Sequence, residues 1–257
     1  MTRRHVFPIL SLLAVAALVL RGTSGASAQG AAAQSAAVKT PKAAAPIDLA
    51  GYWVSVITED WRWRMVTPAK GDYASIPITR EAESIADQWD PAKEEASGEP
   101  CKGFGAGAIM RVPGRLHITW QDDTTLKVEI DAGTQTRLFH FGAWQAPAGD
   151  ATWQGDSVAQ WESAAPRPDG ATFGTLKVVT THFRPGYIRK NGVPYSGNAV
   201  LTEYWDLNVE KNGERWLIIT SVLHDPQFLR FDFLTSPNFK KEPNGAKWDP
   251  TPCTSLW

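Results

Sequence analysis

The sequence has few residues of the kinds that build metal and redox sites. Among its 257 residues are 2 cysteines and 5 histidines. It contains no His-Glu-x-x-His, no Cys-x-x-Cys, no phosphate-binding P-loop and no Gly-x-Gly-x-x-Gly fingerprint. These absences exclude the common local signatures of zinc hydrolases, thiol–disulfide oxidoreductases, nucleoside triphosphatases and nicotinamide-dependent dehydrogenases. We therefore expect no metal and no cofactor.

A surplus of basic residues is also missing. Lysine and arginine together number 26, aspartate and glutamate 27, and the formal net charge at pH 7 is −1. A surface that binds nucleic acid has to neutralise phosphates with lysine and arginine. The charge balance therefore argues against nucleic acid as the main partner.

The N-terminus, in contrast, carries the full pattern of a secretion signal. Arg3 and Arg4 precede a mostly apolar stretch, residues 6–20, and Ala26-Ser27-Ala28 is a small-x-small cleavage site. The stretch is shorter than the roughly 20 residues that a membrane-spanning helix needs. We expect a signal peptide at residues 1–28, no membrane anchor, and a periplasmic or secreted protein.

The rest of the chain divides into a linker and one domain. Residues 29–46 are rich in alanine, glutamine and lysine, which predicts a flexible linker. Residues 47–257 are enough for a single well-buried domain. Cys101 and Cys253 both lie in that domain, and in an oxidising compartment an even pair predicts a disulfide. Two free buried thiols are the alternative.

Alternation of apolar and polar residues with a period of two dominates the domain and predicts antiparallel strands. Lys211-Asn212-Gly213 is the strongest hairpin turn. One short helix is predicted near residues 80–89, capped by Thr79 and ended by Asp90-Pro91. Sequential hairpins favour a single antiparallel up-and-down barrel of about eight or nine strands over a sandwich, because closure removes exposed edges. The expected strands are residues 51–58, 115–120, 125–130, 134–141, 157–162, 175–183, 199–209, 214–223 and 228–234.

Short motifs add a resemblance to known proteins. Gly51-Tyr52-Trp53 resembles the Gly-x-Trp opening of lipocalin-like barrels. Stretches across nearly the whole domain resemble a large family of exported bacterial proteins of undefined function, which implies a lipocalin-like (calycin-type) barrel and export but no settled activity. A Pro- and Ala-rich loop at residues 163–173 departs from the family pattern and puts any role of that hairpin tip in doubt. The matching stretches are residues 60–65, 71–73, 89–91, 101–102, 110–116, 135–137, 152–155, 161–162, 184–187, 225–226 and 252–253.

The first candidate site is a row of ionisable side chains inside the barrel. Glu203 and Trp205 share one face of the strand at 199–209, and a carboxylate there needs a cation, a hydrogen-bond network or a water-filled cavity. His182 and His224, at the ends of neighbouring strands, converge on Glu203 if their rows face inward. A histidine beside a carboxylate suits general acid–base catalysis; a structural pair or an outward-facing row is the alternative. The inward rows expected beside Glu203 are Leu176, Val178 and Thr180 on one strand and Trp216, Ile218, Thr220 and Val222 on the other.

The second candidate centres on Arg137. We expect it to pair with Glu162 across the barrel, or to clamp the carboxylate or phenolate of a ligand. His140, on the same strand, joins the ligand-binding candidates, and Tyr187 is assigned to steady developing negative charge. A purely structural Arg137–Glu162 pair is the alternative.

The third candidate is Trp61-Arg62-Trp63-Arg64, which follows the first strand. Alternating tryptophan and arginine can stack on an aromatic ligand or form a lid. The 12 tryptophans of the chain suit an aromatic ligand. Trp61, Arg62 and Trp63 are therefore ligand-binding candidates, and the alternative is that each tryptophan fills core while the arginines reach solvent.

Three functions fit these observations. The first is a cofactor-free enzyme with lyase, isomerase or hydrolase chemistry on a small aromatic or apolar molecule, such as a plant- or lignin-derived aromatic, with His182, Glu203 and Tyr187 catalytic. The second is a lipocalin-like carrier with the same pocket and no chemistry. The third is an envelope scaffold, which predicts a barrel interior filled by the protein's own side chains. A homo-oligomer is compatible with each.

Overall fold

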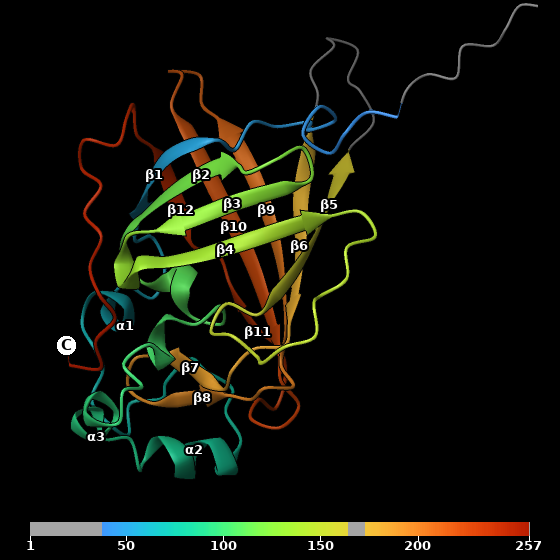
Figure 1. The fold of residues 1–257 in the computed structure, drawn as a ribbon. Helices are drawn as coiled ribbons and strands as arrows, with labels where there is room; N and C mark the ends of the chain where they lie inside the picture. The colour runs from blue at the N-terminus through green and yellow to red at the C-terminus, as the bar shows by residue number, and fades with distance from the viewer. Residues whose placement is uncertain (1–37, 164–172, 257) are drawn as a thin grey trace, which may run out of the picture. The chain divides into compact units, whose positions relative to one another are not determined.

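Nine strands close into a β-barrel (Figure 1). The computed structural model describes residues 38–163 and 173–256, so the predicted signal peptide and most of the 163–173 loop lie outside the described residues. The strand order around the barrel is β10-β12-β1-β2-β3-β4-β5-β6-β9, and β9 pairs back to β10. The mostly-β barrel is therefore confirmed. Its strands, with β11 beside β10, are β1 (Gly51–Val56), β2 (Arg115–Trp120), β3 (Thr125–Ile130), β4 (Gln135–Phe141), β5 (Asp156–Ser163), β6 (Gly174–Thr181), β9 (Val200–Val209), β10 (Arg215–His224), β11 (Phe233–Thr235) and β12 (Asn238–Lys241).

The barrel is mixed rather than purely antiparallel. β4 and β5 run parallel, with Phe139 opposite Ser157, while every other barrel pairing is antiparallel. The connection at residues 142–155 causes the difference, because it carries the chain back to the end of the barrel where β4 began. A tight hairpin at this point would have produced the expected up-and-down order.

Two short strands, β11 and β12, are found in place of the single strand predicted at 228–234. β11 and β12 pair with successive parts of β10, and Ser236-Pro237 separates them. Proline has no N–H to donate to a ladder, but the carbonyl of Pro237 still accepts from the Ile219 N–H at 3.0 Å. The proline therefore splits the strand without opening the barrel.

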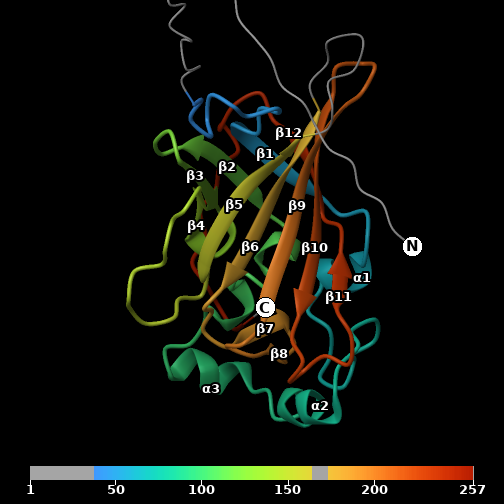
Figure 2. The same cartoon turned by 90° about the vertical axis from the view of Figure 1, so that its right-hand side faces the viewer.

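Short elements that the sequence patterns mostly missed cover one end of the barrel (Figures 1 and 2). The predicted helix is present as α2, and Thr79 caps it by accepting from the Ala82 N–H at 3.3 Å. Asp90-Pro91 does not only end that helix: Asp90 caps α3, accepting from the Lys93 N–H at 3.2 Å. The elements are α1 (Trp61–Met65), α2 (Arg80–Ala86), α3 (Pro91–Ala96), the 3₁₀ turns η1 (Lys102–Phe104), η2 (Ile109–Arg111) and η3 (Ala132–Thr134), and the hairpin of β7 (Gly186–Arg189) and β8 (Val193–Tyr195).

The barrel interior is filled by large side chains. Trp53, Phe139 and Trp205 are fully buried and belong to one apolar cluster. The rings of Phe139 and Trp205 meet edge to face, with centroids 5.2 Å apart. On β10 the predicted inward row is wrong, because the buried residues are those of the opposite parity. They are Leu217, Ile219, Ser221 and Leu223.

Two contacts hold the ends of the domain in place. Cys101 and Cys253 form the predicted disulfide, which joins the segment after α3 to the C-terminal tail. Composition predicted a flexible linker through residue 46, but the carbonyl of Pro41 accepts from the indole N–H of Trp161 at 2.9 Å. The compact unit begins at Val38.

Within the described ranges, no helix is long and apolar enough to cross a membrane.

Candidate anion-binding site

The lumen holds a buried ion pair that the sequence analysis had divided between two sites. Arg137 on β4 binds Glu203 on β9 through both terminal nitrogens, at 2.9 and 2.6 Å, and both side chains are 0% exposed. Arg137 Nη2 also donates to Thr180 Oγ1 at 3.1 Å, and Thr180 in turn shares a hydrogen bond with Ser157. The expected Arg137–Glu162 pair is wrong: Glu162 is exposed and lies 3.5 Å from Lys177.

The predicted meeting of His182 with Glu203 is also wrong. β6 ends at Thr181, and His182 has a left-handed φ of 57°, which breaks the alternation that would have turned its ring inward. Its Nδ1 instead lies 2.7 Å from Asp156. His224 is likewise exposed, 2.7 Å from Asp232. Neither histidine lines the lumen.

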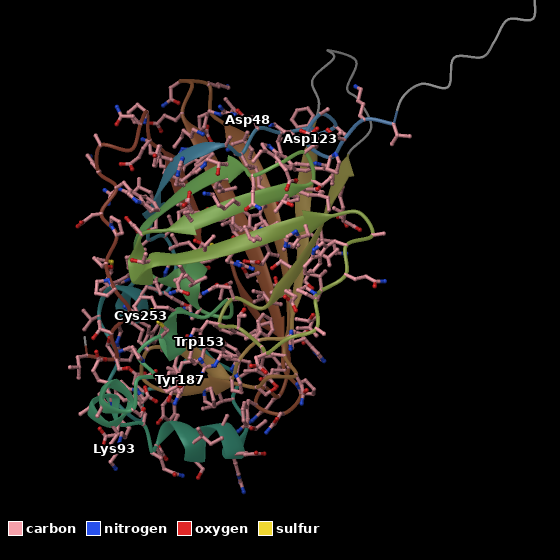
Figure 3. All side chains as sticks on the ribbon, in the orientation of Figure 1. Asp48, Lys93, Asp123, Trp153, Tyr187 and Cys253 are labelled. Carbon is pink, nitrogen blue, oxygen red and sulfur yellow. A yellow bond between two sulfur atoms is a disulfide. The ribbon has the colours of Figure 1, made fainter. Side chains whose placement is uncertain are left out.

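The remaining predicted residues fall into different places. Trp205 lies in the packed lumen and belongs to the core. His140 faces outward and stacks on Trp144 at 4.0 Å, and partial burial lowers its pKa. Trp61, Arg62 and Trp63 all lie on or beside a surface groove at α1. Tyr187, labelled in Figure 3, lies in the layer of short elements at one end of the barrel.

A cluster of buried cations lies in that layer, where sequence analysis had not placed one. Arg64 from α1, Arg111 from η2, and Arg189 and Lys190 from β7 and its turn line one small cavity of about 20 Å³, with Trp63 as a further wall. The three arginine residues are 3–7% exposed. Arg64 and Arg111 are 47 residues apart in the sequence, Arg189 follows far along the chain, and the elements that carry them meet at this end of the barrel.

Each arginine is held by a different neighbour. Arg64 Nε donates to the carbonyl of Arg111 at 2.9 Å, and Arg111 Nη2 donates to Asp60 at 2.7 Å. Arg189 Nη1 donates to the carbonyl of Ala74 at 2.9 Å. These bonds fix the directions of the guanidinium groups before any ligand arrives.

Several carboxylates lie near the cluster. Asp60 pairs with Arg111, Asp60 and Asp72 both act on Arg189, and Glu94 lines the neighbouring cavity with Lys190. Beside Arg64 is Glu59, whose oxygen is 4.0 Å from Arg64 Nη1, too far for a hydrogen bond. Both terminal nitrogens of Arg64 are buried and have no hydrogen-bond partner. Burial and the neighbouring charge of Arg111 lower the pKa of Arg64 to about 10. The group stays charged at neutral pH, so the site offers two buried cationic donors without acceptors.

A second small cavity shares Gly103 and Lys190 with the first. It has a volume of about 10 Å³ and is lined by Glu94, Tyr187 and Lys190 among others. The Tyr187 hydroxyl donates to Glu94, and burial together with that carboxylate raises the pKa of the phenol. Burial lowers the pKa of Lys190 to about 8. Lys190 is therefore the side chain of the cluster whose charge changes nearest to physiological pH.

Part of this cluster was within reach of the sequence. The sequence points to the stretch Trp61–Arg64 as a candidate, either for stacking on a ligand or with its arginines in solvent, but it does not distinguish Arg64 from Arg62. The stretch is helical, so Arg64 turns inward while Arg62 stays exposed. Arg111 and Arg189 carried no local signal, since neither lies in a periodic stretch.

No family model, curated protein or solved structure matches this chain. In the part of the chain that the structure describes, no group of three or more His, Cys, Asp or Glu side chains is arranged to hold a metal ion. The site is therefore defined by its own geometry: a closed β-barrel whose covered end presents a buried, preorganised arginine cluster.

Proposed function

We propose that this protein is exported and binds a small organic anion, a carboxylate, in the pocket of Arg64, Arg111, Arg189 and Lys190. The observation that carries the proposal is the pair of buried, unpartnered terminal nitrogens on Arg64. A buried charged donor without an acceptor is costly, and a carboxylate matches the fork of a guanidinium with two oxygens. The secretion pattern at residues 1–28 and the disulfide support export.

The site is suited to a carboxylate for a second reason. The lumen pair shows what a guanidinium does in this protein when a carboxylate is present: Arg137 takes both oxygens of Glu203 at 2.9 and 2.6 Å. Arg64 has the same two donors and a side chain that is 1% exposed, but the Glu59 oxygen beside it is 4.0 Å away and neither terminal nitrogen makes a hydrogen bond. A ligand carboxylate in that position would supply the missing acceptors.

The test is a calorimetric titration with phenylacetate. Saturable binding at one site is expected, and Arg64→Met should weaken it at least about tenfold, because one charge-assisted interaction is worth roughly 1.5–3 kcal/mol. Lys211→Met removes one charge on the exposed turn between β9 and β10 and is the matched control, with unchanged affinity. Binding that is equally strong in Arg64→Met would refute the site.

A cofactor-free enzyme is a second candidate, favoured by Lys190. Lys190 lines both cavities, and a pKa of about 8 leaves a fraction of its amine neutral at pH 7.5 and able to accept a proton. If Lys190 removes the α-proton of a bound carboxylate, phenylacetate should exchange that proton for deuterium in D₂O, and Lys190→Met should stop the exchange. Binding of phenylacetate without proton exchange would indicate a carrier and would contradict the enzyme proposal.

Large buried side chains belong to the barrel interior, which supports the scaffold alternative. We therefore base the enzyme and the carrier proposals on the arginine pocket and not on the lumen. If the protein binds no carboxylate at all, the scaffold function would be favoured over the enzyme and the carrier.

A further inference from the structure

An apolar groove borders the arginine pocket. It has a volume of about 320 Å³ and lies between α1 and the loop at residues 66–72. Its walls include Trp61, Met65 and Val66, which are 69%, 60% and 70% exposed. Large apolar side chains exposed together in one concave place are characteristic of a binding surface.

The groove is held open by fixed contacts. Asp72, on the loop, accepts from Arg62 at 3.1 Å and from the indole N–H of Trp63 at 3.2 Å. Asn191 donates to the carbonyl of Ala69 at 3.0 Å from the other side. The loop is thus tied to α1 at one point and to the β7–β8 turn at another, so the groove exists before a ligand binds.

Trp63 connects the groove to the pocket. Its side chain lines both, and its ring centroid is 5.4 Å from the guanidinium of Arg62 and 5.1 Å from that of Arg189. One tryptophan therefore borders both the apolar groove and the cationic pocket. A molecule that reaches from one to the other must carry a negative charge at one end and an apolar body at the other.

We propose that the ligand is an amphiphilic aryl carboxylate, with its carboxylate among Arg64, Arg111 and Arg189 and its aromatic body in the groove against Trp61, Trp63 and Met65. This rests on the carboxylate binding proposed above. Tryptophan faces and a methionine thioether both make favourable contacts with aromatic rings. Arg62, at the groove, adds a guanidinium plane on which a ring can stack.

The experiment is a calorimetric series with acetate, phenylacetate, 4-phenylbutyrate and 6-phenylhexanoate. If the body enters the groove, affinity should rise along the series, by at least about tenfold from acetate to 4-phenylbutyrate. The neutral 4-phenylbutanol should bind much more weakly than the acid of the same length. Trp61→Ser/Met65→Ser should flatten the rise while leaving acetate binding unchanged, because both side chains are exposed and neither lines the cationic cavity. Val209→Ser, an equally exposed apolar residue at the other end of the barrel, is the matched control.

The outcomes separate this inference from the function on which it rests. If phenylacetate binds and Arg64→Met abolishes binding, but the series is flat or the double variant leaves it unchanged, the groove is not part of the site and only the inference falls. If no carboxylate binds, the proposed function falls and the inference with it. If Trp61→Ser/Met65→Ser changes sedimentation of the protein and not ligand affinity, the groove is covered by a second copy of the chain, which also overturns the inference.

Discussion

The two buried arginine sites of this protein differ in what surrounds the same chemical group. In the lumen, Arg137 meets a carboxylate and a hydroxyl of its own chain, and both members of the ion pair are 0% exposed. At the covered end, Arg64 is as well buried but has the carbonyl of Arg111 on one nitrogen and no acceptor on the other two. Both terminal nitrogens of Arg137 are paired within the chain and only its Nε has no partner, whereas both terminal nitrogens of Arg64 lack an acceptor.

The difference teaches where to look for function in a packed barrel. A buried charge that the chain itself neutralises contributes to a specific structure, and its removal should be felt in stability. A buried charge left without a partner is kept at a cost, and its removal should be felt in ligand binding. The two sites therefore make opposite predictions for the same substitution.

The largest expected effect is on the lumen. Arg137→Met should lower the free energy of unfolding by about 3–5 kcal/mol, because it leaves the Glu203 carboxylate buried and unpaired. The measurement is urea denaturation at pH 7. Arg137→Met/Glu203→Leu should recover most of the loss, and a double variant as unstable as the single one would contradict the argument. Lys177→Met, which breaks the exposed pair with Glu162, should cost less than about 1 kcal/mol.

The disulfide should come next. Cys101→Ser/Cys253→Ser opens a bridge between residues 152 positions apart, which should lower stability by about 2–5 kcal/mol through the larger freedom of the unfolded chain. Thermal unfolding of the variant beside the oxidised protein measures the loss. The bridge lies in the same layer as the arginine pocket, but neither cysteine lines the pocket. At temperatures where the variant and the oxidised protein are both folded, ligand affinity should therefore stay within about twofold. A large loss of affinity would show that the bridge also shapes the pocket.

At the pocket, Arg64→Met should change stability by no more than about 1 kcal/mol. The variant loses one hydrogen bond, worth about that much, and the attraction to Glu59 and Asp60, but it also relieves the repulsion from Arg111. Urea denaturation of Arg64→Met beside Arg137→Met is the direct comparison. Equal losses in the two variants would show that the pocket is as structural as the lumen.

The smallest effect is a pH dependence carried by Lys190. Burial holds its pKa at about 8, below its ordinary value of 10.5. Between these values the unfolded chain binds more protons than the folded one at this residue, so its contribution to stability rises with pH. Ligand affinity should move the other way, because the pocket loses a positive charge as Lys190 deprotonates.

The measurement is carboxylate affinity and unfolding free energy from pH 7 to pH 9, in the protein and in Lys190→Met. The other charged groups that line the two cavities are Arg64, Arg111, Arg189 and Glu94. Glu59, Asp60 and Asp72 lie beside the arginines, and Lys102 lies 3.6 Å from Glu94. Burial lowers the pKa of both Arg64 and Arg189 to about 10, so the range should end below that value. Slopes that persist in Lys190→Met would assign the effect to another group.

Much of the barrel could be predicted from local patterns. Strand positions from Gly51 to His224 agree within a few residues, because alternation with a period of two is visible in each strand by itself. The Thr79 cap and the pairing of Cys101 with Cys253 were predicted for the same reason: each depends on a residue type and its context. The parallel β4–β5 pairing could not be seen, since the connection at 142–155 has no period of its own.

The candidate site was harder to predict than the fold. Arg137 and Glu203 were each selected, but for different partners, because the register between strands far apart in sequence decides which inward residues meet. His182 was misplaced by a single left-handed residue at the end of a strand. Arg64 was passed over because a five-residue helix, α1, has too few residues to show a helical period.

By itself, the sequence determined that the chain would form a mostly-β barrel with one disulfide, since alternation, turns and cysteine count are properties of short stretches. Only the tertiary structure decided that large side chains would pack the lumen and that the arginine with unpartnered terminal nitrogens, Arg64, would lie outside it. The physical reason is that neutralising a buried charge needs a partner at a particular distance and direction. In this protein those partners come from segments that only folding brings together.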